Sequence, residues 1–383
     1  MTSQEFIQQN LNKPLVETAL LLCKHPTLDK NYILHQINGL QKAKLKLPSF
    51  YENENIIYSS KLAMEQCSSE QTALFKSKLV KEKTVVDLTG GFGVDAYFFS
   101  KQFENVSYIE QNRELFEIVK NNFEVLNAPI QCYQTSCEEF LVKNTQIFDL
   151  AYIDPSRRNE NKRVFQLDEC TPNIIELATE IFKIANKILI KTAPLLDIKQ
   201  TLKDLKFVTD VWVISVANDC KEVLYLLEKN KKVAPQIHTV NLNKTNQFFD
   251  FTFEQEKAIH SEYGLPEKFL YEPNVAVLKA GAFNSVGNHY QLKKIAPNSH
   301  LYTSQQLVAN FPGRVFEIKN VLNYQTNSFS KLGLKKANVS CRNFKDSVAQ
   351  VKKKLKLKDG GEHYVFATTD WNEKPMIIVA NKV

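Results

Sequence analysis

The sequence is poor in glycine and contains no paired cysteines. Only 11 of its 383 residues are glycine, and none of its seven cysteines forms a Cys-x-x-Cys pair. An odd number of scattered cysteines argues against a disulfide framework and structural zinc, and favours a reducing compartment. The sequence also lacks an apolar run long enough to cross a bilayer, and its first residues show no signal-peptide pattern. We therefore expect a cytoplasmic protein with no membrane partner and no metal.

Charge is unevenly distributed. The formal net charge is +7, but residues 278–383 hold 17 Lys or Arg against 6 Asp or Glu, so the rest of the chain is slightly acidic. A basic segment joined to a near-neutral one is typical of proteins with a polyanionic partner, most often nucleic acid. Charge alone is equally compatible with a solvated, lysine-rich surface.

Hydrophobic periodicity divides the chain into regions. Residues 1–80 have apolar positions at helical spacing, and Ser68 with Gln71 fits a capping box that predicts a helix over 69–80. Residues 81–232 alternate strands and helices, which predicts an α/β, Rossmann-like doubly wound sheet with an antiparallel edge. The strands are expected at 84–86, 106–109, 130–133, 148–153, 187–191, 208–216 and 222–227.

The βα rhythm is lost after residue 232. We expect a hairpin and connector over 233–277, and a basic α+β domain over 278–383. In that last domain, Asp346 is placed to cap a helix with Val348, Val351 and Leu355 on its core face and lysines on its outer face. Gly360 and Gly361 are expected to end this helix.

The most informative segment is a glycine-rich turn after the first predicted strand. Asp87 ends that strand, and Gly90, Gly91 and Gly93 follow within six residues. Glycines let the backbone approach a ligand closely, and the helix that follows offers free N–H groups. We therefore predict that a ligand containing adenosine binds at this turn.

Two cofactors compete for the turn. The stretch from Gly91 to Ala96 satisfies the dinucleotide pattern G-x-G-x-x-A, and Glu110 follows where a ribose-binding acid is expected. S-adenosylmethionine also fits, because Asp87 can meet its ammonium group and Glu110 can bind both ribose hydroxyls. A carboxylate directly before the turn has no use in a dinucleotide fold, and Asp154 with Pro155 ends the fourth predicted strand, where methyl-transfer enzymes hold the acceptor. Both features favour S-adenosylmethionine.

Residues 65–230 resemble the class I S-adenosylmethionine-dependent methyltransferases. Asp87 to Gly93, Glu110, and Asp154 with Pro155 are similar to motifs I, II and IV of those enzymes. The lead-in around Ser68 is similar to the segment before motif I in trimethylguanosine-synthase-like RNA methyltransferases. The resemblance implies an enzyme in which Asp87, Thr89, Gly90, Gly91, Gly93, Glu110, Ser136 and Asp154 bind the cofactor, while Asp154, Pro155, Arg157 and Arg158 are catalytic.

The C-terminal part resembles the THUMP-like module of an uncharacterised bacterial family. The similarity lies in residues 272–276, 300–304, 311–314 and 358–361. THUMP modules occur in RNA-modifying enzymes, so the resemblance implies an RNA substrate, either tRNA or rRNA.

Three motifs depart from the methyltransferase pattern. Thr89 replaces the usual first glycine of motif I, and Ser136 stands near the place of the acid that contacts adenine in motif III. At motif IV, Ser156 and Arg157 replace the second proline and the aromatic ring of enzymes that methylate exocyclic amines. Base methylation is therefore only one of the possible reactions.

Two other functions remain open from the sequence. The chain could be an RNA-binding protein whose cofactor-binding fold transfers no methyl group, or an NAD(P)-dependent oxidoreductase. A cysteine nucleophile is disfavoured, since no cysteine directly follows Pro155.

Overall fold

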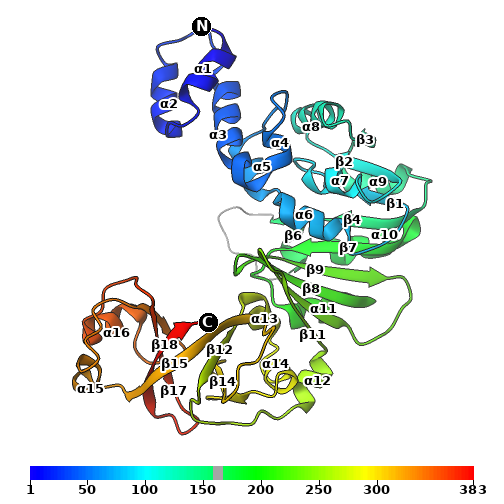
Figure 1. Cartoon of the computed structure of the whole chain (residues 1–383). Helices are drawn as coiled ribbons and strands as arrows, with labels where there is room; N and C mark the ends of the chain where they lie inside the picture. The colour runs from blue at the N-terminus through cyan, green and yellow to red at the C-terminus, as the bar shows by residue number, and fades with distance from the viewer. Residues whose placement is uncertain (158–166) are drawn as a thin grey trace. The chain divides into compact units, whose positions relative to one another are not determined.

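The structure is a computed structural model that describes residues 1–157 and 167–383 (Figure 1). It consists of two compact units, the first formed by residues 1–209 and 224–233 and the second by residues 210–223 and 234–383. In the described part of the chain, no helix is long and apolar enough to cross a membrane.

The first unit begins with short helices and continues as alternating strands and helices. Its helices are α1 (Ser3–Asn10), α2 (Leu15–Leu22), α3 (Lys30–Lys46), α4 (Pro48–Tyr51), α5 (Lys61–Gln66), α6 (Glu70–Ser77), α7 (Val94–Phe99), α8 (Arg113–Val125), α9 (Cys137–Lys143), α10 (Ile174–Ile184) and α11 (Ile198–Asp204). Its parallel strands are β1 (Thr84–Asp87), β2 (Asn105–Glu110), β3 (Ile130–Gln134), β4 (Phe148–Ile153) and β7 (Ala185–Thr192). A small strand pair, β5 (Ser156–Arg157) and β6 (Cys170–Thr171), lies outside the main sheet.

The main sheet has the order β11-β10-β8-β9-β7-β4-β1-β2-β3. Its remaining strands are β8 (Val208–Val216), β9 (Asp219–Glu228), β10 (Gln236–Leu242) and β11 (Gln247–Phe251). The chain runs outward from β1 in one direction and then, through β4, in the other, and this reversal makes the sheet doubly wound. The sequence prediction of an α/β, Rossmann-like sheet is confirmed.

The predicted hairpins are confirmed, but their places in the sheet differ from the prediction. Ala217 and Asn218, both at positive φ, form the two-residue turn between β8 and β9, and such a turn joins antiparallel strands. β10 pairs with β8 in parallel, and β11 pairs with β10 in antiparallel fashion. The antiparallel edge is therefore β11, and the second hairpin is part of the sheet.

Side chains of the N-terminal helical segment pack around the glycine-rich turn. Phe92, in the middle of that turn, packs against Phe50 and Tyr58, with ring centroids 5.9 and 6.2 Å apart. The amide of Asn122 on α8 bonds both the N–H and the C=O of Ile57, at 2.9 and 2.8 Å. These contacts place the segment before β1 against the turn.

The predicted cap of α6 is displaced by one residue. The N-cap is Ser69, whose hydroxyl accepts a hydrogen bond from the N–H of Thr72, and the helix ends at Ser77. The prediction that Ser68 caps this helix is wrong, because the Ser68 side chain is engaged in a buried polar network.

The second unit carries a seven-stranded sheet of order β13-β14-β12-β15-β18-β17-β16. Its strands are β12 (Phe269–Pro273), β13 (Lys293–Lys294), β14 (Tyr302–Ser304), β15 (Gly313–Asn323), β16 (Asn338–Cys341), β17 (His363–Thr369) and β18 (Pro375–Lys382). Its helices are α12 (Phe253–Ala258), α13 (Val275–Ala280), α14 (Ser285–His289), α15 (Thr326–Ser330) and α16 (Val348–Leu355).

The prediction of a lysine-covered helix is confirmed, but the residues predicted to begin and to end it are wrong. Ser347 forms the capping box with Gln350, while the Asp346 carboxylate instead accepts a hydrogen bond from the Tyr324 hydroxyl. The helix ends at Leu355, and its C-cap Lys356 takes the left-handed conformation before the chain reaches Gly360. A complete capping box satisfies two helix N–H groups and so outcompetes a lone Asp.

Candidate functional site

The glycine-rich turn is shaped by close contacts that exclude side chains. A Cβ on Gly90 would lie 2.1 Å from the ring of Tyr108, and one on Gly93 would lie 2.5 Å from Val119. Gly93 also has φ 76° where it begins α7. At Gly91, which has φ 55°, an added Cβ would meet only one atom, the Thr89 carbonyl oxygen at 3.8 Å. The turn is thus tightly packed at Gly90 and Gly93 and open at Gly91.

Asp87 at the end of β1 is a buried carboxylate. It is 1% exposed and accepts a hydrogen bond of 3.1 Å from the N–H of Thr89. Burial, and then the nearby Asp95 carboxylate, raises the pKa of Asp87 well above its ordinary value. Within residues 1–157 and 167–383, no cation forms an ion pair with Asp87. Lys191 is close enough to act on Asp87 weakly, so among the described residues this buried acid has a distant positive charge but no direct cationic partner.

Glu110 at the end of β2 contacts the turn directly. One of its oxygens accepts a hydrogen bond of 3.0 Å from the N–H of Gly91, and the other accepts one of 2.7 Å from Asn112. Burial raises the pKa of Glu110. The structure thus brings Asp87, Glu110 and the glycines together at the carboxyl ends of neighbouring strands, where ligands bind in open α/β sheets.

Thr89 links the turn to the end of β4. Its N–H bonds Asp87, and its hydroxyl accepts a hydrogen bond of 2.7 Å from the backbone N–H of Asp154. Glycine at this position could not accept that bond. The departure from the usual motif therefore has a structural role, since it ties the turn to the predicted acceptor site.

Lys191 is the main site residue that sequence reasoning missed. It lies near the end of β7, beside β4, and its ammonium group forms an ion pair with the carboxylate of Asp154. The signal was present, because a lysine ends the fifth predicted strand at the edge where Asp87, Glu110 and Asp154 end theirs. Strand prediction alone could not show that Lys191 pairs with Asp154.

Ser68 joins this ion pair to a second, buried one. Its hydroxyl donates to Asp95 at 2.7 Å and accepts from Lys76 at 2.7 Å and from Lys191 at 3.4 Å. A hydroxyl has one donor and two acceptor positions, so all three are used. This arrangement explains why Ser68 does not cap α6.

Asp95 and Lys76 form the buried ion pair, with 2.9 Å between Nζ and Oδ1. Asp95 also accepts a hydrogen bond of 2.9 Å from the Tyr152 hydroxyl. Burial alone would raise the pKa of Asp95, but the ammonium groups of Lys76 and Lys191 hold it below its ordinary value. We call Ser68, Lys76, Asp95, Asp154 and Lys191 the polar network.

A third lysine lies near the polar network. Lys46, at the end of α3, donates to the carbonyl oxygens of Met64 and Glu65 at 2.9 and 3.0 Å. Burial lowers the pKa of Lys46, and the nearby Lys191 ammonium acts in the same direction. The surroundings of the polar network therefore contain both carboxylates and ammonium groups.

The other predicted site residues are described only in part. Ser136 caps α9 by accepting a hydrogen bond from Glu139, and Pro155 follows Asp154 at the end of β4. For Arg157 the structure describes the backbone in β5, and Arg158 lies outside the described residues. Across the described ranges, no group of three His, Cys, Asp or Glu side chains is arranged to hold a metal.

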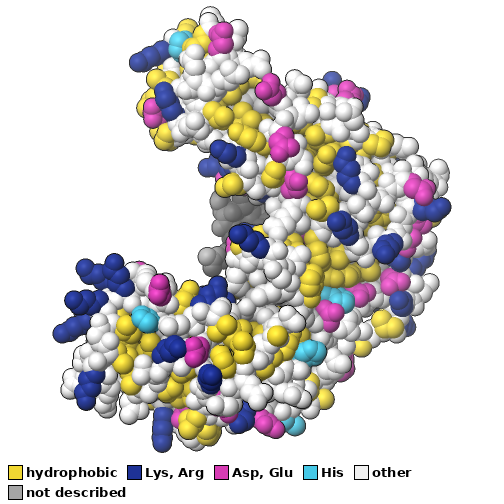
Figure 2. Space-filling model, in the orientation of Figure 1, with side chains coloured by type: hydrophobic (Ala, Val, Ile, Leu, Met, Phe, Trp, Pro, Cys, Tyr) yellow, Lys and Arg dark blue, Asp and Glu magenta, His cyan; other side chains and the backbone are white. Residues whose placement is uncertain are grey.

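Basic side chains gather on one part of the second unit. Lys and Arg residues cluster over α15 and α16 on the face shown in Figure 2. The exposed members between β15 and β17 are Lys331, Lys335, Lys336, Lys345, Lys353, Lys354, Lys356 and Lys358. We call this set the lysine patch.

Family profiles match the second unit. The profile of a ferredoxin-like domain matches residues 269–312, and that of a THUMP domain-like family matches residues 313–382. These two segments meet between β14 and β15. No protein of curated function matches the chain significantly.

Solved structures resemble the chain to different extents. The crystal structure of a candidate methyltransferase from Porphyromonas gingivalis W83 superposes with a TM-score of 0.88 at 31% identity, covering 100% of this chain and 97% of that one. A candidate RNA methyltransferase from Pyrococcus horikoshii is 14% identical, with a TM-score of 0.32 over 45% of this chain and 91% of its own. A candidate methyltransferase from Streptococcus mutans, in complex with S-adenosylhomocysteine, is 16% identical, with a TM-score of 0.32 over 42% of this chain and 96% of its own.

Only the first of these likenesses supports an assignment. It extends over the whole chain at an identity that indicates common descent, whereas the other two are too distant to support an argument. The chain therefore belongs to the family of the Porphyromonas gingivalis protein, in which a class I methyltransferase-type sheet precedes a C-terminal THUMP-like domain.

Proposed function

We propose that this protein is an S-adenosylmethionine-dependent methyltransferase that modifies RNA. The observation that carries the proposal is Asp87, a buried carboxylate without a cationic partner among the described residues, directly before an open glycine turn. A buried carboxylate is stable as an anion only when positive charge or several donors accompany it. Asp87 would receive that charge from the ammonium group of the cofactor.

Glu110 is suited to the cofactor's ribose. Its raised pKa indicates a carboxylate with little solvation, and two hydroxyl donors would stabilise its charged form. The backbone of Thr89, Gly90, Gly91 and Gly93 would lie beneath the cofactor, with Gly91 on the open side. Ser136 would contact the adenine ring.

Asp154 and Lys191 would act on the acceptor. Bound S-adenosylmethionine supplies an electrophilic methyl group, and its in-line transfer depends mainly on positioning. Asp154 would orient the acceptor, with its own carboxylate held in place by Lys191 and by the Thr89 contact at its backbone. Pro155 would fix the chain direction after β4, and Arg157 and Arg158 would grip an RNA phosphate.

The RNA partner is inferred from the lysine patch. A dense set of exposed lysines on a THUMP-like fold offers a phosphate backbone a large attractive field. The same charge would draw RNA to the protein without selecting its sequence.

One observation supports a non-catalytic alternative. Ser156 stands where many amine methyltransferases have a second proline, so the motif lacks a residue typical of that chemistry. In this alternative, the protein would bind cofactor and RNA without methyl transfer. An NAD(P) function is less favoured, because a pyrophosphate at the turn would bring no positive charge to the buried carboxyl group of Asp87.

The test is methyl transfer from labelled S-adenosylmethionine to RNA from cells that lack the protein. We expect label in tRNA or rRNA with the wild-type protein, and at least about a hundredfold less with Asp154→Ala, given the contribution of positioning. Glu117→Ala, which removes an exposed acid on α8, is the control. Cofactor binding without any labelled RNA would instead support the non-catalytic alternative.

A further inference from the structure

A buried glutamate in the second unit holds two arginines. Glu272, at the end of β12, is 3% exposed at its side chain. One of its oxygens accepts from Nε and Nη2 of Arg314, and the other accepts from Nε, at 3.0 Å, and Nη2, at 2.7 Å, of Arg342. Arg314 and Arg342 are themselves 35% and 38% exposed at the side chain. One buried negative charge thus orients two half-exposed positive ones.

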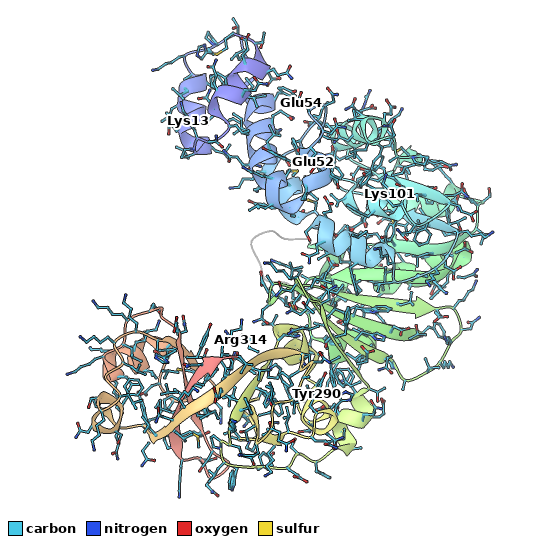
Figure 3. The ribbon with its side chains drawn as sticks, in the orientation of Figure 1. Lys13, Glu52, Glu54, Lys101, Tyr290 and Arg314 are labelled. Carbon is cyan, nitrogen blue, oxygen red and sulfur yellow. The ribbon has the colours of Figure 1, made fainter. Side chains whose placement is uncertain are left out.

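The arrangement is built by segments that are far apart in sequence. Arg314 on β15 is the direct cross-strand partner of Glu272, and Arg342 follows β16 (Figure 3 labels Arg314). A Cβ on Gly313 would lie 2.1 Å from the Glu272 carbonyl oxygen, so the close approach of β15 to β12 requires glycine there. The residues that resemble a THUMP-like module in sequence, 272–276 and 311–314, therefore meet at this point.

Both guanidinium groups retain unused donors. Each binds Glu272 through Nε and Nη2, which leaves Nη1 without a hydrogen bond among the described residues. Arg314 is further held over the rings of Phe316 and Tyr364, at 5.5 and 5.8 Å from the centroids. Two fixed, planar groups with free N–H donors match the oxygens of a phosphate.

The surroundings add positive charge without further acids at hydrogen-bond distance. Lys294 is 3% exposed and, among the described residues, forms no hydrogen bond or ion pair through its ammonium group. His300 stacks on Phe283 with centroids 3.7 Å apart, and its buried Nδ1 has no partner in the described part of the chain. Burial, then Lys294 and Arg342, lowers the pKa of His300 to about 4, so both cations lie near this ring.

We propose that Arg314 and Arg342 form a phosphate-binding site that positions one backbone phosphate of an RNA strand. The site is separate from the lysine patch and from the glycine turn. The choice of RNA rests on the proposed function, whereas the phosphate chemistry follows from the two guanidinium groups. The lysine patch attracts the strand at long range, and the arginine pair fixes where it lies.

Binding of a short fluorescein-labelled single-stranded RNA to the full-length protein tests this site by anisotropy over a range of salt concentrations. For Arg342→Gln we expect affinity about tenfold weaker and a salt slope smaller by about one. Arg342→Lys should lose less RNA affinity than Arg342→Gln, because lysine keeps the positive charge although it lacks the planar, forked set of N–H donors of arginine. Lys319→Gln is the control, since Lys319 is an exposed cation on β15, the strand of Arg314, and pairs with Glu317.

Arg342→Gln leaves Glu272 paired with Arg314, and thermal unfolding checks that it folds. If Arg342→Gln does not fold, the RNA affinity of Arg342→Lys is compared with that of the wild type instead. Equal affinities for wild type and both Arg342 variants, or an equal loss with Lys319→Gln, overturn the site. Direct binding of millimolar inorganic phosphate in calorimetry that is lost in Arg342→Gln, together with unchanged RNA affinity, overturns the RNA assignment in favour of free phosphate. Calorimetry with S-adenosylmethionine on the same samples reports the cofactor site independently.

Discussion

Removing the ammonium group of Lys76 should strongly destabilise the first unit. Lys76 has no exposed side-chain surface, and its partner Asp95 is 10% exposed. In Lys76→Met, the carboxylate of Asp95 would stay buried with the Ser68 and Tyr152 hydroxyls as donors and with the Lys191 ammonium as the nearby positive charge. Breaking a buried pair from one side costs about 3–5 kcal/mol. The two remaining hydrogen bonds offset part of this, so we expect a loss of about 2–4 kcal/mol.

Urea unfolding followed by circular dichroism measures this loss. The double variant Lys76→Met with Asp95→Asn should recover most of it, because no unpaired charge remains. The loss in the single variant should also shrink as the pH falls below neutrality, since an unpaired buried carboxylate has a raised pKa and becomes protonated. Lys183→Met, which breaks an exposed pair with Glu180, is the control and should cost less than about 1 kcal/mol.

A loss in Lys76→Met no larger than that of Lys183→Met would refute the reasoning. So would a double variant that is less stable than the single one. Either result would mean that the attraction between the charges of Lys76 and Asp95 does not contribute to the stability of the protein.

Three further predictions concern the turn, the acceptor site and the second unit. Gly93→Ala should destabilise the protein by about 1–3 kcal/mol in thermal unfolding, because φ is 76° and Val119 lies 2.5 Å from the new Cβ. The control Gly333→Ala, where φ is 66° and no atom lies near the new Cβ, should cost about 1 kcal/mol. Equal costs for the two variants would contradict the packing argument. Lys191→Met should lower the methyl-transfer rate at least about tenfold while cofactor affinity changes less than about threefold; an unchanged rate would remove Lys191 from the acceptor site. Burial alone would lower the pKa of His238, but Asp210 and Asp250 raise it from 6.5 to about 9, so its contribution to stability is full below pH 6.5 and is lost as the pH rises through about 9. This loss should be on the order of 1–2 kcal/mol in urea titrations at several pH values, and His238→Gln should flatten the profile; identical profiles would rule the pair out.

Local sequence patterns predicted the sheet well, because the spacing of apolar residues that distinguishes strands from helices can be read from neighbouring residues. Residues 148–153 form β4 as expected, and the glycines after Asp87 form the tight turn. The pattern of apolar residues fixes a strand's position, since a buried strand needs a continuous apolar run bounded by turn residues.

The polar network could not be predicted, because it depends on contacts between distant segments. The capping-box pattern with Gln71 favoured Ser68, but the contacts of Ser68 with Asp95 and Lys191 leave Ser69 to cap α6. The capping box of Ser347 with Gln350 was present in the sequence, whereas the contact of Asp346 with Tyr324 depends on a distant segment. Lys191 could be placed at the end of β7 from its strand pattern, but its pairing with Asp154 required the strand order.

Isothermal calorimetry with S-adenosylmethionine tests the central claim most directly. We expect one molecule to bind per chain, with affinity weakened at least about tenfold by Asp87→Asn, which removes the negative charge and keeps the size of the side chain. Wild-type protein should give no heat with NAD⁺ or NADP⁺ under the same conditions. Binding of a dinucleotide in place of S-adenosylmethionine, or equal affinity of the wild type and Asp87→Asn, would contradict the account.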